Sequence, residues 1–262
     1  MPMFTLADGD QLYFEEHGEG PPLLLVSGLS GVSAFWSVHV PHLAQSFRVI
    51  VHDHRGTGQS SRSAIRYSVD QMADDIAQLM AGLGIERAHF VGHSTGGAIG
   101  QILAIDRPGL IDRLVLGATW TAADDYFRRC FAVRSEILRL NGMETYIRAA
   151  SIFMRPADWV RDNLSRMIEE EARAAEASTA EIMLSRIEAI LAFDRREDLS
   201  RITAPTLVLG ARDDLVTPAY YSEALGELIP GAETVLLPRG GHFFPVICPQ
   251  AFREKLDAFL VH

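Results

Sequence analysis

The hydrophobic positions of this chain fall into two alternating patterns. Short continuous apolar runs, typical of strands buried on both faces of a sheet, occur at residues 23–26, 48–51, 89–91, 114–116, 207–209 and 234–237. Segments with apolar side chains at helical spacing separate most of them, at 69–83, 98–105 and 220–229. Because strands that alternate with helices form a mainly parallel sheet covered on both faces, the pattern predicts an α/β fold.

Two segments depart from this alternation. Near the start, apolar residues at 4, 6, 12 and 14 surround an Asp-Gly turn, which predicts a β-hairpin. Between 120 and 200 no buried-strand run occurs, and the spacing predicts helices over 131–140, 143–153, 159–174 and 182–193, with breaks at Asn141-Gly142 and at Pro156. Strand patterns resume at 207, so we expect residues 120–200 to form a helical cap inserted into an α/β core of 1–119 and 201–262.

The charge balance argues against several kinds of partner. Thirty-four acidic and 24 basic residues give a net charge of −10 without a basic block, so we expect no nucleic-acid or membrane partner. No apolar run reaches the roughly 18 residues of a membrane span, and the first ten residues do not resemble a signal peptide. Cys130 and Cys248 are too far apart to suggest a metal site or a disulfide framework. We therefore expect a cytoplasmic protein, monomeric or homodimeric, that acts on a small molecule and needs no metal or cofactor.

Arginine supplies nearly all the positive charge. Of the 24 basic residues 23 are arginine, and Lys255 is the one lysine. Leu256 follows it, which excludes a Gly-Lys-Ser/Thr phosphate loop, and a Schiff-base mechanism would have to use this lysine near the end of the chain. A positive charge in a binding pocket is therefore expected to come from arginine.

One short segment has the pattern of a catalytic nucleophile. The apolar run 89–91 leads directly into a Gly-X-Ser-X-Gly sequence, and a helical pattern follows: Gly92-His93-Ser94-Thr95-Gly96. A nucleophile on a tight strand-to-helix turn needs minimal neighbouring side chains, and the helix start directs free N–H groups toward it. A glycine-rich turn with a capping serine is the alternative, but the strand before and the helix after favour Ser94 as nucleophile.

The serine needs a base, and nine histidines compete for that role. His242 follows the last predicted strand, in a loop expected at the carboxyl edge of the sheet where the Ser94 turn also lies. His93 is too close to Ser94 in sequence to turn its ring onto the hydroxyl, and we expect it to support the turn. The sequence therefore predicts His242 as the base.

The acid that orients the base is expected after the strand at 207–209, where two aspartates compete. Asp214 lies four residues before Pro218, which favours it, whereas Asp213 lies three residues after Gly210, which favours that alternative. We predict Asp214 as the acid, and expect Asp213 to brace the turn or face solvent.

Hydrolysis also requires two backbone N–H groups that bind the negative oxygen formed during the reaction. Thr95, directly after the nucleophile, is expected to supply one. Leu29 is expected to supply the other, from the glycine-containing loop 27–31 after the first buried strand. A plain glycine loop is the alternative.

These motifs together resemble the α/β-hydrolase-fold family over the whole chain. They stand in family order: Ser27-Gly28-Leu29, Asp53-His54-Arg55-Gly56-Thr57-Gly58-Gln59-Ser60, Gly92-His93-Ser94-Thr95-Gly96 and Gly241-His242. Within the family, the chain is similar to 3-oxoadipate enol-lactonases and to the aminoacrylate or carbamate hydrolase of pyrimidine utilisation, the latter through residues 128–134 and 155–159. The resemblance implies that residues 53–60 shape a turn beside the pocket. Many relatives have His-Gly where this chain has Ser27-Gly28.

The resemblance implies a cap over the catalytic residues, whose side chains select the substrate. The predicted pocket residues are aromatic: Trp36, Trp120, Phe153, Trp159 and Phe243. Ordinary packing in the cap core is the alternative for each of them. Arg128, Arg148 or Arg155 could bind a substrate carboxylate, but a solvated surface position is the favoured interpretation for each of them.

The sequence thus predicts a serine hydrolase that cleaves a small ester, lactone, enol-lactone or amide-like acyl compound through a covalent acyl-enzyme. Two alternatives use the same three residues. One is a slow-turnover ligand receptor of the strigolactone-receptor type, and the other is a hydrolase of C–C bonds in dienoates.

Overall fold

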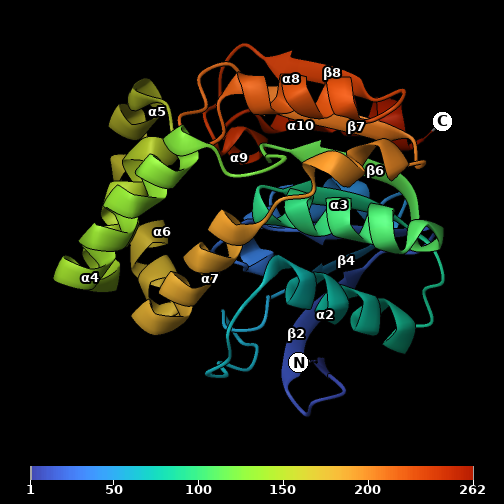
Figure 1. The fold of residues 1–262 in the computed structure, drawn as a ribbon, viewed down its shortest axis with the longest axis horizontal. Coiled ribbons are helices and arrows are strands. Elements are labelled where there is room, and N and C mark those ends of the chain that lie inside the picture. Colours follow the sequence, from blue (N-terminus) through green and yellow to red (C-terminus); the bar gives the residue numbers. More distant parts are fainter. Residues whose placement is uncertain (1, 262) are drawn as a thin grey trace.

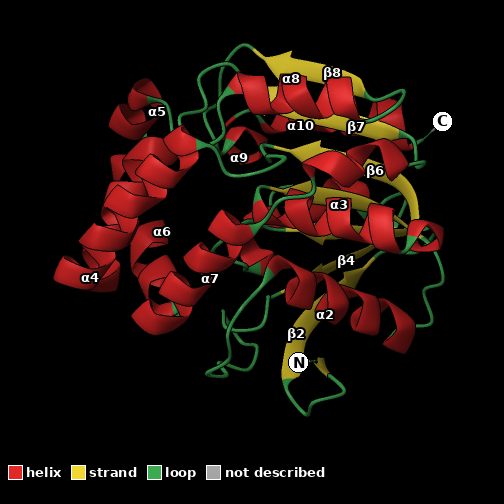
Figure 2. Cartoon of the chain, in the orientation of Figure 1, coloured by secondary structure: helices red, strands yellow, loops and turns green. Residues whose placement is uncertain are grey.

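An eight-stranded sheet forms the centre of the computed structural model, which describes residues 2–261 (Figures 1 and 2). Its strand order is β1-β2-β4-β3-β5-β6-β7-β8. The β1–β2 and β2–β4 pairs are antiparallel and all other neighbouring pairs are parallel, which confirms the predicted α/β fold and the N-terminal hairpin. The strands are β1 Met3–Thr5, β2 Gln11–His17, β3 Pro22–Val26, β4 Arg48–His52, β5 Ala88–His93, β6 Ile111–Gly117, β7 Thr206–Ala211 and β8 Glu233–Leu237.

Helices cover both faces of the sheet (Figure 1). On one face pack α2 (Val69–Gly82), α3 (Thr95–Asp106) and α8 (Ala219–Leu228), and on the other pack α1 (Val40–Leu43) and α10 (Pro249–Leu260). Short elements connect them: η1 Ser33–Trp36, η2 Pro108–Leu110, η3 Arg196–Arg201 and α9 Phe244–Ile247.

The central strands are apolar throughout because each face has its own core. Along β3, Leu24 and Val26 belong to the core under α2 and α3, whereas Leu23 and Leu25 belong to the core under α1 and α10. Successive side chains of a strand point to opposite faces, so a strand covered on both sides shows a continuous apolar run.

Four helices lie between β6 and β7: α4 (Asp125–Met154), α5 (Ala157–Asp162), α6 (Leu164–Glu176) and α7 (Ala180–Ala192). We call these residues, 125–192, the insert. It lies beside one end of the sheet (left in Figure 1), and its apolar side chains join the same core cluster as those of α2 and α3. The division into a core and a cap domain stays a prediction, and its outermost residues, 1 and 262, lie outside the described part of the chain.

Two of the predicted insert helices have different limits in the structure. The first begins at Asp125 rather than at 131, because the Asp124 side chain caps it by accepting a 2.8 Å hydrogen bond from the Phe127 amide. It continues across the predicted break, where Gly142, at φ 75°, leaves helical geometry and kinks α4.

The predicted helix over 159–174 is wrong as a single element. Asn163 leaves helical geometry, and its side-chain amide donates a 3.0 Å hydrogen bond to the Trp159 carbonyl, which separates α5 from α6. Within residues 2–261 the helices include none that combines the length and the apolar character needed to cross a membrane.

Candidate active site

Ser94 occupies the turn between β5 and α3 in a backbone conformation that side-chain-bearing residues rarely adopt. Its φ is 55° and its ψ is −116°, and its amide donates a 2.8 Å hydrogen bond to the Gly117 carbonyl on neighbouring β6. The turn closes only around glycine, because a Cβ at Gly92 would collide with the Gly96 carbonyl and one at Gly96 with the Val26 carbonyl. Ser94 keeps 8% of its surface exposed.

The loop after β3 lies directly against this turn. A Cβ placed on Gly28 would be 3.1 Å from the Ser94 Cβ, so the loop backbone approaches Ser94 closely. The Leu29 amide has no backbone acceptor within residues 2–261, and Thr95 opens α3, where the first amides have no intrahelical acceptor. Both amides are therefore free to donate to a ligand, and their oxyanion role stays a prediction.

His242 and Asp214 are joined by a buried hydrogen bond. The imidazole Nδ1–H donates to the Asp214 Oδ2 over 2.9 Å, and both residues are 3% exposed. Burial alone would raise the pKa of Asp214. The charge and hydrogen bond of His242, with the amides of Thr217 and Val216, outweigh that effect and lower it below its ordinary value. The carboxylate therefore stays ionised and keeps the imidazole proton on Nδ1, which leaves Nε2 free to accept a proton.

Thr217 is a neighbour of this pair that the sequence analysis missed. Its hydroxyl donates a 2.8 Å hydrogen bond to Asp214 Oδ2, and its amide donates to Oδ1 over 3.0 Å. The spacing of an aspartate and a threonine three residues later in a loop indicates such side-chain to backbone hydrogen bonds, and could have identified Thr217.

Asp213 makes different contacts from Asp214. Its two carboxylate oxygens accept hydrogen bonds from the Gly240 and Gly241 amides, over 3.2 and 2.8 Å. Gly240, at φ 131°, and Gly241, at φ 59°, adopt backbone angles that favour glycine, so the turn before His242 depends on both. The structure thus places Asp214 on the imidazole and Asp213 on the turn that carries it.

His93 connects the Ser94 turn to the His242 loop. Its Nε2–H donates a 2.8 Å hydrogen bond to the His242 carbonyl, and its ring stacks on Phe35, with centroids 4.7 Å apart. Burial lowers the pKa of His93 to about 3, so it is neutral at physiological pH. Ser94 and His242, both within the described chain, share no hydrogen bond; catalytic hydrogen bonds often form only once a substrate is bound.

The aromatic residues predicted for the pocket separate into two groups. We expected Trp36 and Trp120 to line it, but the structure buries both almost completely in the core. Trp36 stacks on Phe252 of α10, at 6.1 Å between centroids, and Trp120 packs against Phe127 of α4, at 4.9 Å. Large aromatic side chains stabilise a core strongly, and sequence alone does not separate that use from ligand contact.

The other three predicted pocket residues are partly exposed: Phe153, Trp159 and Phe243. Phe243 lies between His242 and Phe35, with its ring centroid 6.2 Å from that of His242 and 5.4 Å from that of Phe35. Its amide donates a 3.0 Å hydrogen bond to the Met154 carbonyl at the end of α4. The insert therefore contacts the loop that carries His242. Phe35 was missed because a single aromatic residue in a loop gives no signal of its neighbours.

Of the three arginines considered as carboxylate contacts, Arg155 lies against Phe243, the residue after His242. Arg128 and Arg148 are exposed, whereas the Arg155 guanidinium is nearly buried, 4.9 Å from the centroid of the Phe243 ring. Arg155 also forms a 2.9 Å ion pair with Glu170 of α6. No group of three metal-ligating side chains gathers anywhere in residues 2–261.

Comparison with known proteins gives consistent matches. Residues 21–246 match a family described as alpha/beta hydrolase fold. A protein of Azorhizobium caulinodans with the provisional name carbamate hydrolase RutD is 41% identical over 99% of this chain and 98% of its own. A protein of Caulobacter sp. (strain K31) with the same name is 40% identical over 96% of both chains. The enol-lactonase from Burkholderia xenovorans LB400 superposes with a TM-score of 0.93, at 27% identity over 100% of both chains. The resemblance drawn from the motifs is confirmed.

Proposed function

Because the chain belongs to the alpha/beta hydrolase fold family and is a hydrolase, we propose that it cleaves a small acyl compound through a covalent intermediate on Ser94. The observation that carries this proposal is the 2.9 Å hydrogen bond between His242 Nδ1 and Asp214 Oδ2. It leaves the second imidazole nitrogen free to act as a base, in a loop that His93 holds against the Ser94 turn.

The proposed reaction begins when His242 Nε2 takes the Ser94 hydroxyl proton. The Ser94 Oγ attacks the substrate carbonyl carbon, and the carbonyl electron pair moves onto its oxygen. The Leu29 and Thr95 amides bind that oxygen. The tetrahedral centre then collapses, and the leaving group departs with the proton from His242.

A water molecule completes the cycle. His242 Nε2 takes a proton from the water as its oxygen attacks the acyl carbon, and the proton then returns to the Ser94 Oγ as the acid product leaves. Through both halves Asp214 stabilises the imidazolium, consistent with its lowered pKa.

We propose a carbamate, or another compound with a C–N bond at the acyl carbon, as the substrate class. The two relatives named carbamate hydrolase, at 41% and 40% identity, support this choice. The partly exposed aromatic rings of Phe35 and Phe243 suit a small, flat substrate, and Arg155 suits a carboxylate on it. The insert then acts as the cap that brings Arg155 to the catalytic residues.

An enol-lactone is the second candidate. The solved structure named enol-lactonase covers the whole chain with a TM-score of 0.93, which supports a similar backbone arrangement around the site. A ring ester and a carbamate require the same nucleophile and the same oxyanion donors.

A substrate panel tests the proposal. It covers short esters, lactones, enol-lactones, amides and carbamates, assayed with the wild-type protein and with Ser94→Ala. We expect steady turnover of about 1 s⁻¹ or more on at least one class, and none in the variant. A single slow turnover accompanied by a large thermal shift would instead indicate a ligand receptor.

A further inference from the structure

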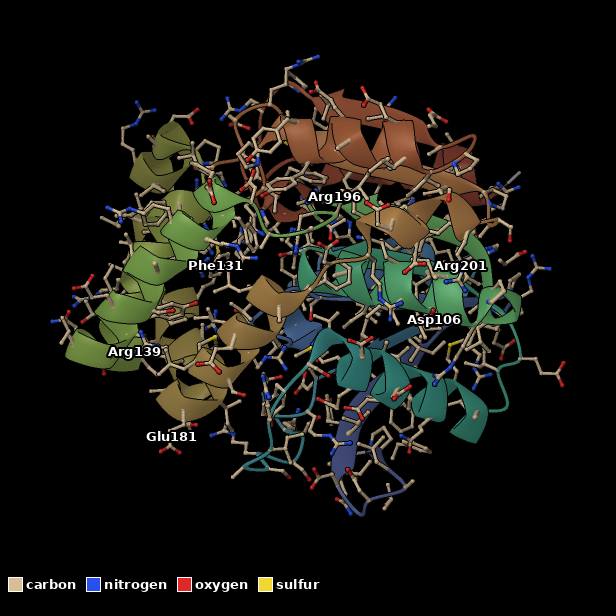
Figure 3. The ribbon with its side chains drawn as sticks, in the orientation of Figure 1. Asp106, Phe131, Arg139, Glu181, Arg196 and Arg201 are labelled. Carbon is tan, nitrogen blue, oxygen red and sulfur yellow. The ribbon has the colours of Figure 1, made fainter. Side chains whose placement is uncertain are left out.

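Arg186 of α7 is completely buried, and no acidic side chain is bonded to it within residues 2–261. Its guanidinium donates to three acceptors in the core: the Leu29 carbonyl over 3.1 Å, the Arg55 carbonyl over 2.9 Å and the His54 Nδ1 over 3.0 Å. One side chain of the insert thus holds together the loop after β3 and the loop after β4. Figure 3 shows α7 between α4, where Phe131 is labelled, and the core helices.

A buried charge without an ionic partner costs stability, so a position that keeps one calls for a physical reason. Burial lowers the pKa of Arg186 to about 10, and the group therefore remains charged at neutral pH. A guanidinium offers five N–H donors in a rigid plane and can bond several acceptors at once, which a lysine ammonium cannot do in the same geometry.

The loop around the guanidinium is closely packed. Residues 28–31 form a turn closed by a 3.0 Å hydrogen bond from the Gly31 amide to the Gly28 carbonyl. Gly31 has a φ of 67°, and a Cβ there would lie 3.0 Å from the Arg186 Nη2. Leu29 is the second residue of this turn. Its carbonyl is bonded to Arg186, while the preceding Gly28 lies against Ser94.

We propose that Arg186 is a positioning residue for the oxyanion site. By holding the Leu29 carbonyl, it sets the orientation of the turn and directs the Leu29 amide toward the oxygen of the reacting group. The inference rests on the proposed function, because it requires that Leu29 donate to the substrate oxygen. It makes the insert part of the catalytic arrangement through α7, in addition to any contact with substrate.

A purely structural role would give the same contacts, so the test needs a second arginine that joins separate elements of the fold away from the turn 28–31. Arg195, just after α7, forms ion pairs with Asp70 of α2 over 2.7 Å and Asp106 of α3 over 2.9 Å. Within the described chain, no hydrogen bond or ion pair joins its side chain to the turn 28–31.

The experiment compares Arg186→Met, Arg186→Lys and Arg195→Met, with kcat expressed per site titrated by a fluorophosphonate. The probes are a chromogenic short ester, and an alkylboronic acid whose adduct with Ser94 places an oxygen in the oxyanion site. In Arg186→Met we expect kcat to fall by about 10² to 10³, with KM within about threefold. Boronic-acid affinity should fall by the same factor as kcat/KM. Arg186→Lys should fall less, and Arg195→Met should keep kcat and boronic-acid affinity within about threefold while melting at a lower temperature.

The inference is overturned if titrated sites of Arg186→Met keep wild-type kcat and boronic-acid affinity. If Arg186→Met does not fold, the boronic-acid affinity of Arg186→Lys is compared with that of Arg195→Met instead. A loss of boronic-acid affinity beyond that of Arg195→Met supports positioning, and an equal loss contradicts it. The Ser94→Ala variant distinguishes failure of the positioning role from failure of the proposed function. If Ser94→Ala turns over the ester like the wild type, the proposed function itself fails. If Ser94→Ala is inactive but the Arg186 variants behave as wild type, the positioning role fails and the proposed function stands.

Discussion

The His93 side chain donates a 2.8 Å hydrogen bond from Nε2 to the main-chain carbonyl of His242. The residue before the proposed nucleophile thereby holds the loop that carries the proposed base. His93 is 2% exposed, so this bond is shielded from bulk solvent.

Replacing His93 with phenylalanine is therefore expected to lower kcat. The variant keeps a ring against Phe35 and loses the donor, which leaves the His242 carbonyl without its partner. Losing a buried hydrogen bond costs about 1–3 kcal/mol, equivalent to a fall in kcat of about 5- to 160-fold if the His242 ring is displaced. Steady-state kinetics measure this effect.

His39→Phe is the matched control, because His39 donates a similar 2.9 Å hydrogen bond to the Pro245 carbonyl. We expect that variant to lose stability with a smaller change in kcat. Equal losses of kcat in the two variants would show that the His93 bond has no special effect on the base.

Asp214→Asn and Asp213→Asn should differ strongly. The first removes the charge that holds the His242 tautomer, and we expect kcat to fall by about 10³ to 10⁴. The second leaves an oxygen that can still accept from the Gly241 amide, so we expect a fall of no more than about tenfold. Steady-state kinetics of both purified variants measure this difference in kcat. A larger loss of kcat in Asp213→Asn than in Asp214→Asn would assign the acid to Asp213.

Acid should destabilise the protein from about pH 6.5 downward. Burial lowers the pKa of His39 to about 4, those of His52 and His93 to about 3, and that of His54 well below its ordinary value of 6.5. The unfolded chain therefore binds more protons than the folded one below pH 6.5. The stabilisation is complete above that pH, and is lost as the pH falls toward the folded pKa values.

Each of these histidines contributes up to about 1.4 kcal/mol per pH unit to the slope of the unfolding free energy. Urea unfolding at pH 7.5, 6 and 5 measures the slope. His52→Gln should lower this slope by up to about 1.4 kcal/mol per pH unit, because the unfolded variant binds one proton fewer. An unfolding free energy that stays level over this range would contradict the neutral, buried state of these rings.

Arg155→Met should affect anionic substrates selectively. A charge-assisted hydrogen bond contributes about 1.5–3 kcal/mol, so KM for a carboxylate-bearing substrate should rise at least about tenfold. KM for a neutral ester should stay within about threefold. Arg148→Met, at an exposed position, provides the comparison, and the same KM change in both variants would exclude Arg155 as the carboxylate contact.

The sheet and the Ser94 turn could be predicted from local sequence because their causes are local. Buried strands need continuous apolar runs, and the turn needs glycine at Gly92 and Gly96. The two aspartates could not be separated with certainty in this way. Both lie in one loop, and only the three-dimensional path brings Asp214 to the imidazole and Asp213 to the Gly241 amide.

Arg186 shows the limit of sequence reasoning most clearly. It lies 157 residues from the Leu29 carbonyl that it bonds, in a helix where an arginine normally indicates a solvated face. The prediction of Trp36 and Trp120 as pocket residues is wrong for a related reason. An aromatic residue near the Ser94 and His242 loops packs equally well into the core beneath them.

The nucleophilic role of Ser94 is tested most directly by intact-mass spectrometry of protein quenched with acid while it turns over a p-nitrophenyl carbamate, whose good leaving group makes hydrolysis of the carbamoyl-enzyme the slower step. We expect the quenched wild-type protein to carry the mass of one carbamoyl group, and peptide mapping to place it on Ser94. Ser94→Ala, folded and equally exposed to the reagent, should gain none. An adduct of the same stoichiometry in Ser94→Ala, or turnover of the carbamate by that variant, would contradict the account.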